Sequence, residues 1–370
     1  MYIYQNHDWP SFVWDDESIK SLLPKIYELQ GNLKGKLSTL GFSWVEEAQM
    51  KMLTEDVLKT SQIEGHILNA DSVRSSVARR LGMDTEISTL PHDRHIEGIV
   101  DMLFEASAGY NEPLTHERLF GWHAALFPGG YSGIHKIHVG GYRPDDSDPM
   151  LVVSGFLGRE KIHYEAPKAS TLLKEMGAFL NYANLNTSTD PILKAAVAHL
   201  WFVTLHPFED GNGRIGRAIC DLLLAKAALS SKKFYTLSSQ IEKDRKNYYH
   251  FLETTQKGTM NITHWLVWFL ESLFKALEHS FEIIEDVLLK AQFWNKAREN
   301  SLSPRQIKVL KKMLHGFDGK LTSSKWGLIT NCSQDTALRD ITQLLEWGVL
   351  EKSYEGGRTT HYVLAINSLL

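Results

Sequence analysis

Apolar residues recur at helical spacing over most of the chain, so the sequence predicts a mainly α-helical protein. Ser43 and Glu46 have the spacing of a capping box, in which Ser43 would cap the start of a helix. Apolar positions then repeat near every third or fourth residue to about Thr60. We expect a helix over this stretch.

A second helix is indicated where Asp190, a suitable N-cap, precedes Pro191 and an apolar run that continues to Leu205. Because this run is apolar on nearly all sides, we place it at the centre of a helical bundle. Pro207 disfavours helical backbone at His206, so the helix should end there. A glycine-rich turn follows, and the apolar period then resumes.

The segment from Val139 to Pro167 departs from the helical pattern. It contains the turn-forming stretch GGYRPDDSDP and then two apolar stretches, MLVVSGF and KIHYEAP, on either side of Gly158. Such short stretches flanking a glycine are typical of paired strands. The sequence therefore predicts a β-hairpin inserted in the helical body.

The last seventy residues, 301–370, have a third pattern. Ser303 and Pro304 indicate the start of a helix, and two further helical stretches follow near 323–329 and 333–346. The strand-turn-strand pattern KSYEGGRTTHYVL comes next. Three short helices followed by a hairpin predict a winged helix-turn-helix domain.

The composition of the 370 residues, 43% hydrophobic and 23% charged, is that of an ordinary globular protein. Cys220 and Cys332 are too few for a disulfide framework. The N-terminus lacks the pattern of a signal peptide, and the longest apolar runs are too short to span a bilayer. We therefore expect a soluble, cytoplasmic protein with no membrane partner.

The net charge of −4 argues against a chain that coats nucleic acid along its whole length. Residues 301–370, however, carry nine Lys and Arg against six Asp and Glu. This small local excess of basic residues leaves DNA open as a partner of the C-terminal domain, with a protein contact or dimerisation as the alternative.

Residues 206–217, HPFEDGNGRIGR, have the composition of a phosphate-binding loop. The glycines on either side of Asn212 allow backbone N–H groups to turn inward at the start of a helix, where the helix dipole also favours an anion. Arg214 and Arg217 supply fork-shaped donors that suit phosphate oxygens. A glycine-rich turn with solvated arginines would explain each residue singly, but not the twelve-residue combination.

The other polar residues of this loop indicate the chemistry. A bare carboxylate would repel a phosphate, so Asp210 is best explained as a ligand of Mg²⁺ that also contacts the phosphates. His206 follows a rigid helix and has the side chain suited to act as a general base near neutral pH. Phe208 should turn into the core.

These residues resemble the signature of the Fic proteins, HxFx(D/E)GNGRxxR. The match is complete, at His206, Phe208, Asp210, Gly211, Asn212, Gly213, Arg214 and Arg217. The resemblance implies a Fic-type helical bundle that moves a nucleoside monophosphate, usually AMP from ATP, onto a hydroxyl group of a protein. It implies that His206 deprotonates the target hydroxyl and that Asp210 holds Mg²⁺.

The resemblance also implies the remaining nucleotide contacts. The amides of Gly211, Asn212 and Gly213 would cradle the α- and β-phosphates, and Arg217 would hold the γ-phosphate. Arg214 and Gly216 complete the predicted nucleotide-binding set. The branch of the family that phosphorylates has a lysine in this loop, which this chain lacks, so kinase activity is disfavoured.

The predicted hairpin, at 150–167, resembles the flap with which Fic proteins align a target segment by strand addition. A lid without a recognition role is the alternative. We divide the chain into an N-terminal helical region, 1–100, a Fic core, 101–295, and a winged-helix domain, 301–370.

TSQIEG, residues 60–65, resembles the inhibitory motif (S/T)xxxE(G/N) of the branch with an N-terminal inhibitory helix. A buried Glu64 paired bidentately with Arg217 would occupy the arginine that the γ-phosphate needs. The alternatives are an exposed glutamate at a helix end, or a catalytic Glu64 that orients water to remove AMP.

Some polar and aromatic residues stay outside these assignments. The spacing of His92, His95 and Glu97 would suit a metal, but surface or capping roles are commoner. Tyr248 or Tyr249 could stack on adenine, but their helical spacing with apolar neighbours favours a place in the core. In the C-terminal domain the candidate base contacts are polar, with Asp335 and Asp340 opposing them; they are Gln334, Thr336, Arg339, Gln343 and Arg358.

The sequence thus predicts an autoinhibited protein adenylyltransferase that uses ATP and Mg²⁺ and releases pyrophosphate. Its partner would be a target protein with a Ser, Thr or Tyr hydroxyl, with self-modification and a homodimer left open. The alternative is a DNA-binding regulator in which the Fic body senses ATP.

Overall fold

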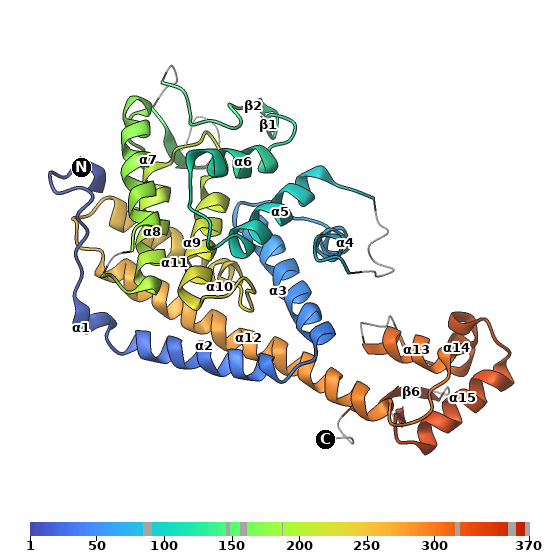
Figure 1. The fold of residues 1–370 in the computed structure, drawn as a ribbon. Coiled ribbons are helices and arrows are strands. Elements are labelled where there is room, and N and C mark those ends of the chain that lie inside the picture. The colour runs from blue at the N-terminus through green and yellow to red at the C-terminus, as the bar shows by residue number, and fades with distance from the viewer. Residues whose placement is uncertain are drawn as a thin grey trace. The chain divides into compact units, whose positions relative to one another are not determined.

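The computed structural model describes residues 1–83, 91–145, 149–155, 161–186, 188–314, 319–353 and 360–366. The chain forms two compact units, one of residues 1–39 and 45–283 and another of 40–44 and 284–370. Both are built mainly from helices, as predicted (Figure 1). Within the described residues, no helix has the length and apolar character needed to cross a membrane.

The N-terminal part of the larger unit is a succession of helices. They are the 3₁₀ helix η1 (Ile3–Gln5) and the α-helices α1 (Asp16–Ile19), α2 (Leu22–Ser38), α3 (Phe42–Ile63), α4 (Ala70–Arg80), α5 (Arg94–Ala108) and α6 (His116–Leu126). The predicted helix near residues 43–60 is α3, but Ser43 lies inside its first turn. Its predicted role as N-cap is therefore wrong.

The centre of this unit is the helix pair α8 (Pro191–Leu205) and α9 (Asn212–Ala228), which lie side by side (Figure 1). Every residue of α8 from Ile192 to Leu205 is buried, as its apolar composition predicts. The Asp190 side chain accepts hydrogen bonds from the first turn, and the helix ends at His206. The surrounding helices are α7 (Ala169–Asn184), α10 (Leu237–Lys243), α11 (Arg245–Gln256) and α12 (Thr263–Ala297).

Two β-hairpins lie in the larger unit. β1 (Tyr131–Ser132) pairs with β2 (His135–Lys136), and β3 (Leu151–Ser154) pairs with β4 (Lys161–Glu165), both antiparallel. The second pair is the predicted insertion, with a bulge between Val152 and Val153. Gly158, the predicted turn residue, lies outside the described residues.

The first residues of the chain pack beneath the second hairpin, a role that the sequence did not indicate. The rings of Tyr2 and Tyr4 lie 5.1 Å and 6.2 Å from that of Tyr164 on β4, both edge-on. The hydroxyl of Tyr164 donates a 2.7 Å hydrogen bond to the Thr204 carbonyl in α8. The N-terminus thus supports the strand that connects the hairpin to the end of α8.

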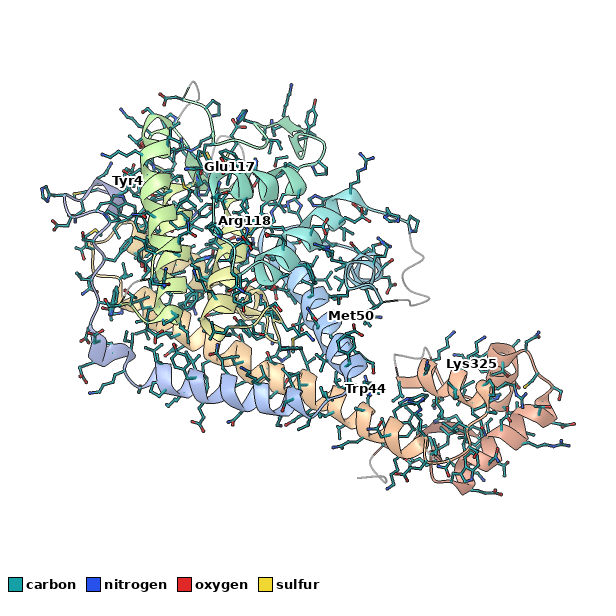
Figure 2. The ribbon with its side chains drawn as sticks, viewed as in Figure 1. Tyr4, Trp44, Met50, Glu117, Arg118 and Lys325 are labelled. Atoms are coloured by element: carbon teal, nitrogen blue, oxygen red, sulfur yellow. The ribbon has the colours of Figure 1, made fainter. Side chains whose placement is uncertain are left out.

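In the smaller unit, the C-terminal part of α12 is followed by helices and a hairpin in the predicted order. These elements are α13 (Pro304–Leu314), α14 (Ser323–Thr330), α15 (Gln334–Glu346), β5 (Leu350–Ser353) and β6 (His361–Leu364). Its core surrounds the fully buried Trp326, and Trp44 packs against the same cluster (Figure 2). The order of elements is consistent with a winged helix. Arg358 lies outside the described residues.

Candidate active site

The loop between α8 and α9 is closed by its own side chains. His206 adopts a left-handed backbone with φ 47°, and Gly211 adopts φ 85° just before α9 begins. The Asn212 side chain accepts from the Phe208 N–H at 2.9 Å and donates to the Phe208 carbonyl at 2.7 Å. Phe208 is fully buried, as predicted. Because both ends of the Asn212 amide hold the loop, Asn212 can offer a phosphate its backbone N–H.

The first turn of α9 faces a carboxylate. A Cβ added to Gly213 would lie 2.2 Å from Oε1 of Glu64, so only glycine allows this approach. The same Oε1 accepts a 2.7 Å hydrogen bond from Nη2 of Arg217. Glu64 therefore occupies the position where backbone N–H groups and an arginine would receive an anion.

The contact between Glu64 and Arg217 differs from the expected geometry. Arg217 uses a single nitrogen toward Glu64, because Thr60 holds its other edge: Nε donates to Thr60 Oγ1 at 2.8 Å and Nη2 also to the Thr60 carbonyl at 3.0 Å. The predicted bidentate pairing is therefore wrong. Glu64 is also not buried, since 27% of its side chain is exposed.

Arg217 and Arg214 retain unused hydrogen-bonding capacity at this position. Both guanidinium groups are buried, and Nη1 of Arg217 and Nε of Arg214 have no hydrogen-bond partner among the described residues. The Arg214 guanidinium lies over the Phe127 ring, 5.0 Å from its centre. Buried donors left unpaired are costly and suit a site that receives an anionic ligand.

Gly216 has a packing role in the structure. A Cβ there would lie 3.0 Å from Cγ1 of Val203, so the glycine lets α9 approach α8 closely. Its place in the predicted nucleotide-binding set stays a prediction.

The His206 ring is set up to accept a proton. Its Nδ1 lies 3.2 Å from the Val203 carbonyl, an acceptor, so Nδ1 carries the hydrogen and Nε2 has the free lone pair. The surrounding protein desolvates the ring and lowers the pKa of His206 to about 4. His206 is therefore neutral at physiological pH.

Asp210 presents a carboxylate at the rim of the loop, with 38% of its side chain exposed. Oδ1 accepts from the Gly211 N–H and Oδ2 from the Ser132 hydroxyl, each at 2.5 Å. The described part of the chain holds no cluster of three or more His, Cys, Asp or Glu side chains that could bind a metal. A single carboxylate suits Mg²⁺, which commonly completes its shell with phosphate oxygens and water.

Arg143, in the GGYR stretch, holds the start of the loop. Its Nε donates to the His206 carbonyl at 3.0 Å and its backbone N–H to the Pro207 carbonyl at 2.9 Å. Its Nη2 donates to the carbonyl of Pro167, the residue after the hairpin region. Arg143 therefore has a structural role, in which it connects the loop to the hairpin.

The hairpin is also attached to α11 through a chain of side chains. His163 on β4 has Nε2 2.6 Å from the Ser154 hydroxyl and Nδ1 2.7 Å from Oε2 of Glu253. Glu253 also accepts from Lys257 at 2.7 Å, and these contacts lower the pKa of Glu253 to about 2. The β3–β4 hairpin is thus attached to α8 through Tyr164 and to α11 through His163.

Several residues to which the sequence analysis gave no catalytic or metal-binding role have hydrogen-bond partners within the protein. His92 contacts Glu97 at 2.5 Å, and Nδ1 of His95 contacts the Leu126 carbonyl at 3.2 Å. Tyr248 is buried with its hydroxyl 3.0 Å from His199, as a core residue should be. Tyr249 is 40% exposed, so its predicted place in the core is wrong.

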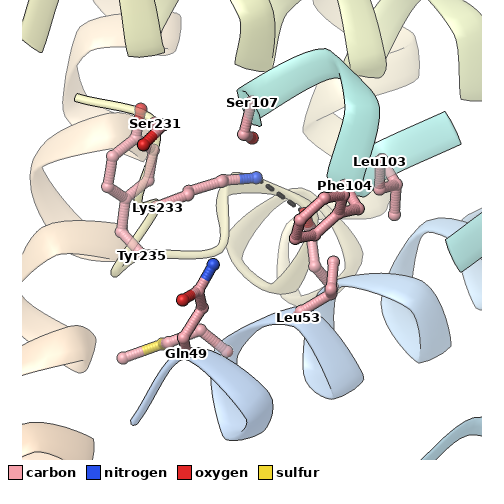
Figure 3. A pocket seen from close by; sticks show the side chains of 10 residues that line it. Gln49, Leu53, Leu103, Phe104, Ser107, Ser231, Lys233 and Tyr235 are labelled. Atoms are coloured by element: carbon pink, nitrogen blue, oxygen red, sulfur yellow. Dashed lines mark hydrogen bonds and ion pairs between the residues drawn. The ribbon is translucent and has the colours of Figure 1, made fainter. Parts of the chain in front are cut away.

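A separate pocket lies between α3, α5 and the segment after α9 (Figure 3). Its volume of about 20 Å³ leaves room for a water molecule and not for an organic ligand. At its wall Lys233 contacts Asp56 on α3 and Asp221 on α9, each at 2.6 Å. This buried cluster of Lys233, Asp56 and Asp221 joins α3 to α9. Along α3 the cluster lies near Glu64, and along α9 it lies near Arg217.

The geometry defines a helical protein with an anion-binding loop that combines two buried arginines, a carboxylate and a neutral histidine. A model described as the Fic/DOC family matches residues 113–224, which include this loop. A model described as a domain of unknown function (DUF4172) matches residues 2–83. Residues 113–224 are therefore a Fic/DOC-type domain.

Curated proteins are similar to part of the chain. Proteins named "Protein adenylyltransferase Fic" from Drosophila willistoni and Drosophila ananassae are 24% identical over 225 residues and 25% over 222 residues. Each match covers 58% of this chain and 39% of the relative, so the chain spans about two fifths of the length of these curated relatives.

The solved structures concern the fold. A Fic family protein from Desulfovibrio desulfuricans superposes with a TM-score of 0.56 at 20% identity, covering 94% of this chain and 95% of the other. A Fic domain containing signaling protein from Bacteroides thetaiotaomicron gives 0.53 at 18% identity, covering 70% and 97%.

Proposed function

We propose that this chain is an autoinhibited protein adenylyltransferase that transfers AMP from ATP to a hydroxyl side chain of a target protein and releases pyrophosphate. One observation carries the proposal: the carboxylate of Glu64 lies at the first turn of α9 and is paired with Arg217. An anion-binding position is thus complete in the protein and is filled by one of its own side chains. The name of the Drosophila relatives supports AMP transfer.

The residues present fit ATP and Mg²⁺. The N–H groups at the start of α9 and the unpaired nitrogens of Arg214 and Arg217 would receive phosphate oxygens. Asp210 would hold Mg²⁺, which when bound neutralises charge that develops on the phosphates.

His206 supplies the proton chemistry of the proposed reaction. Its Nε2 lone pair would accept the proton of the target hydroxyl as the oxygen bonds to the α-phosphorus and pyrophosphate leaves. The hydrogen bond from Nδ1 to the Val203 carbonyl holds the ring in the required tautomer.

Glu64 is the proposed brake. A γ-phosphate needs the same face of Arg217 that Glu64 contacts, and the two anions would repel each other. Replacing Glu64 by Gly removes the competing carboxylate and leaves Thr60 to orient the guanidinium. Hydrolytic removal of AMP, in which Glu64 orients a water that attacks the phosphorus and releases AMP and the free hydroxyl, is a second role that the exposed part of its carboxylate would permit.

The experiment is incubation of the purified chain and a cell lysate with α-labelled ATP and Mg²⁺. We expect weak labelling of proteins by the wild type, strong labelling by Glu64→Gly and none by the double variant Glu64→Gly, His206→Ala. Equal labelling by wild type and Glu64→Gly would place the brake elsewhere. If none of the labelling depends on His206, the proposal is wrong.

Three measurements address the partners that the sequence leaves open. Label on the chain itself would show self-modification, and the mass of the chain in solution would show whether it is a homodimer. For residues 301–370, salt-dependent binding to random duplex DNA would favour the regulator alternative.

A further inference from the structure

Residues 123–143 contact several residues of the loop between α8 and α9. Arg143 binds the carbonyls of His206 and Pro207, as described above. The backbone N–H of His138 donates to Oε2 of Glu209 at 2.6 Å. Two further contacts, from His123 and Ser132, converge on Asp210.

His123 fixes the main chain of Asp210. This histidine is fully buried, and its ring is stacked on Phe208 with centres 4.3 Å apart and an angle of 12°. The backbone N–H of Gly140 donates to Nδ1 at 3.2 Å, so Nε2 carries the hydrogen that reaches the Asp210 carbonyl at 3.2 Å. With its backbone held, Asp210 keeps freedom only in its side-chain torsions.

Ser132 restricts that remaining freedom. It lies on β1, and its hydroxyl donates to Oδ2 of Asp210 at 2.5 Å, while Oδ1 accepts from the adjacent Gly211 N–H. The Gly211 contact is local and belongs to the loop itself. The Ser132 contact comes from a residue 78 positions away, so it orients the carboxylate from outside the loop. Arg214 on α9 also faces Asp210, but its Nη2 lies 3.7 Å from Oδ1, beyond hydrogen-bond distance.

The strand that carries Ser132 has no large apolar anchor of its own. Tyr131 beside it is 55% exposed, and Ile134 in the turn is 88% exposed. The hairpin is instead attached to the loop by polar contacts, from Ser132 and from His138 just after β2.

We infer that Ser132 is a positioning residue that orients the Asp210 carboxylate for a divalent cation and thereby sets the affinity of the site for Mg²⁺. The inference rests on the role of Asp210 in the proposed function. Hydrogen bonds to a ligating carboxylate fix its orientation, and their loss commonly lowers metal affinity about 10- to 100-fold.

The test measures metal binding directly. In the Glu64→Gly background, Mn²⁺ is titrated by electron paramagnetic resonance in the presence of α,β-methylene-ATP. We expect Ser132→Ala to weaken Mn²⁺ binding about 10-fold or more, and Ser132→Thr, which keeps the hydroxyl, to restore it. Ser38→Ala, at the end of α2, is the matched control and should change nothing.

Asp210→Ala separates failure of this inference from failure of the proposed function. If Asp210→Ala weakens Mn²⁺ binding and Ser132→Ala does not, or if Ser132→Ala tightens it, the role of Ser132 is overturned and the proposed function stands. If Asp210→Ala has no effect, the proposed metal site falls, and the role of Ser132 falls with it.

Kinetics provide a second readout that a merely structural role would not move. For Ser132→Ala, the Mg²⁺ concentration that gives half-maximal labelling should rise about 10-fold, while the rate at saturating Mg²⁺ stays near that of the background. A fall in the maximal rate with an unchanged Mg²⁺ requirement would contradict the inference.

Discussion

Arg217 is a buried side chain that is shared between two residues of the N-terminal region. Its guanidinium contacts Thr60 twice and Glu64 once, and one nitrogen stays unpaired among the described residues. Thr60 therefore orients the arginine whether or not Glu64 is present. The spacing of TSQIEG predicted that Glu64 approaches Arg217 but not how the arginine is shared, because hydrogen-bond geometry is decided by the packing of α3 on α9.

Thr60→Val tests the orienting contact at the scale of a single residue. The variant keeps the shape of this fully buried side chain and removes the hydroxyl that accepts from Nε. Losing a hydrogen bond to a charged group should lower the free energy of unfolding by about 1.5–3 kcal/mol. Urea denaturation measures this. A stability equal to that of the wild type would contradict the contact.

His206 leads to a prediction on pH. Because desolvation lowers its pKa to about 4, the ring is neutral throughout pH 6–8. In the Glu64→Gly variant, labelling should therefore show no loss assignable to His206 as the pH falls from 8 to 6, and a loss as the pH approaches 4. Titration of the His206 ring by NMR provides the direct measurement, and a midpoint near 6.5 would contradict the prediction.

At the scale of elements, the helices that surround the loop were more predictable than the contacts that hold it. Asp190 with Pro191, and His206 with Pro207, are local signals, and α8 begins and ends where they place it. The contacts of residues 123–143 join positions 63 to 87 apart in sequence. No spacing rule covers such distances, so Ser132 and His123 carried no signal that sequence reasoning could use.

The attachment of α3 to α9 through Lys233 is a second element-scale feature. Asp56 and Asp221 are both buried and share this one lysine. Lys233→Met would leave two buried carboxylates without their cation, and we expect a loss of stability of about 3–5 kcal/mol. Thermal unfolding of Lys233→Met against Lys232→Met, a change at the adjacent exposed lysine, checks this.

The same cluster predicts how stability depends on pH. Burial raises the pKa of Asp221 to about 7, well above its usual value in an unfolded chain. The folded state then binds more protons than the unfolded state between about pH 4 and 7, so the contribution of Asp221 to stability falls as the pH rises through this range. Asp221→Asn should flatten the difference in urea midpoint between pH 5 and 8, and an unchanged difference would contradict the assignment.

At the scale of the whole molecule, the chain consists of two units with separate sets of buried residues. In the smaller unit Asp340 is buried and paired with Arg305 at 2.8 Å and 3.2 Å, so it does not oppose phosphate on the exposed face of α15 as the sequence suggested. The partner of this unit stays a prediction.

A core substitution tests whether the units are independent. Trp326→Ala should destabilise the smaller unit by about 3–5 kcal/mol, because it empties the centre of that core. Hydrogen exchange should then increase within residues 301–366, while ATP labelling by the Glu64→Gly background stays unchanged. Loss of labelling in a chain whose larger unit still resists exchange would show that the units are coupled.

The pairing of Glu64 with Arg217 determines how the proposed inhibition would depend on the amount of the protein. Both residues belong to one chain, so in the proposed function the carboxylate would be a tethered competitor of the γ-phosphate, with an effective concentration that is set by the fold and cannot be diluted. Inhibition of this kind is unimolecular and stays the same however much of the protein a cell makes. What changes the balance is the supply of free nucleotide, so the resting protein would respond to ATP and not to its own abundance.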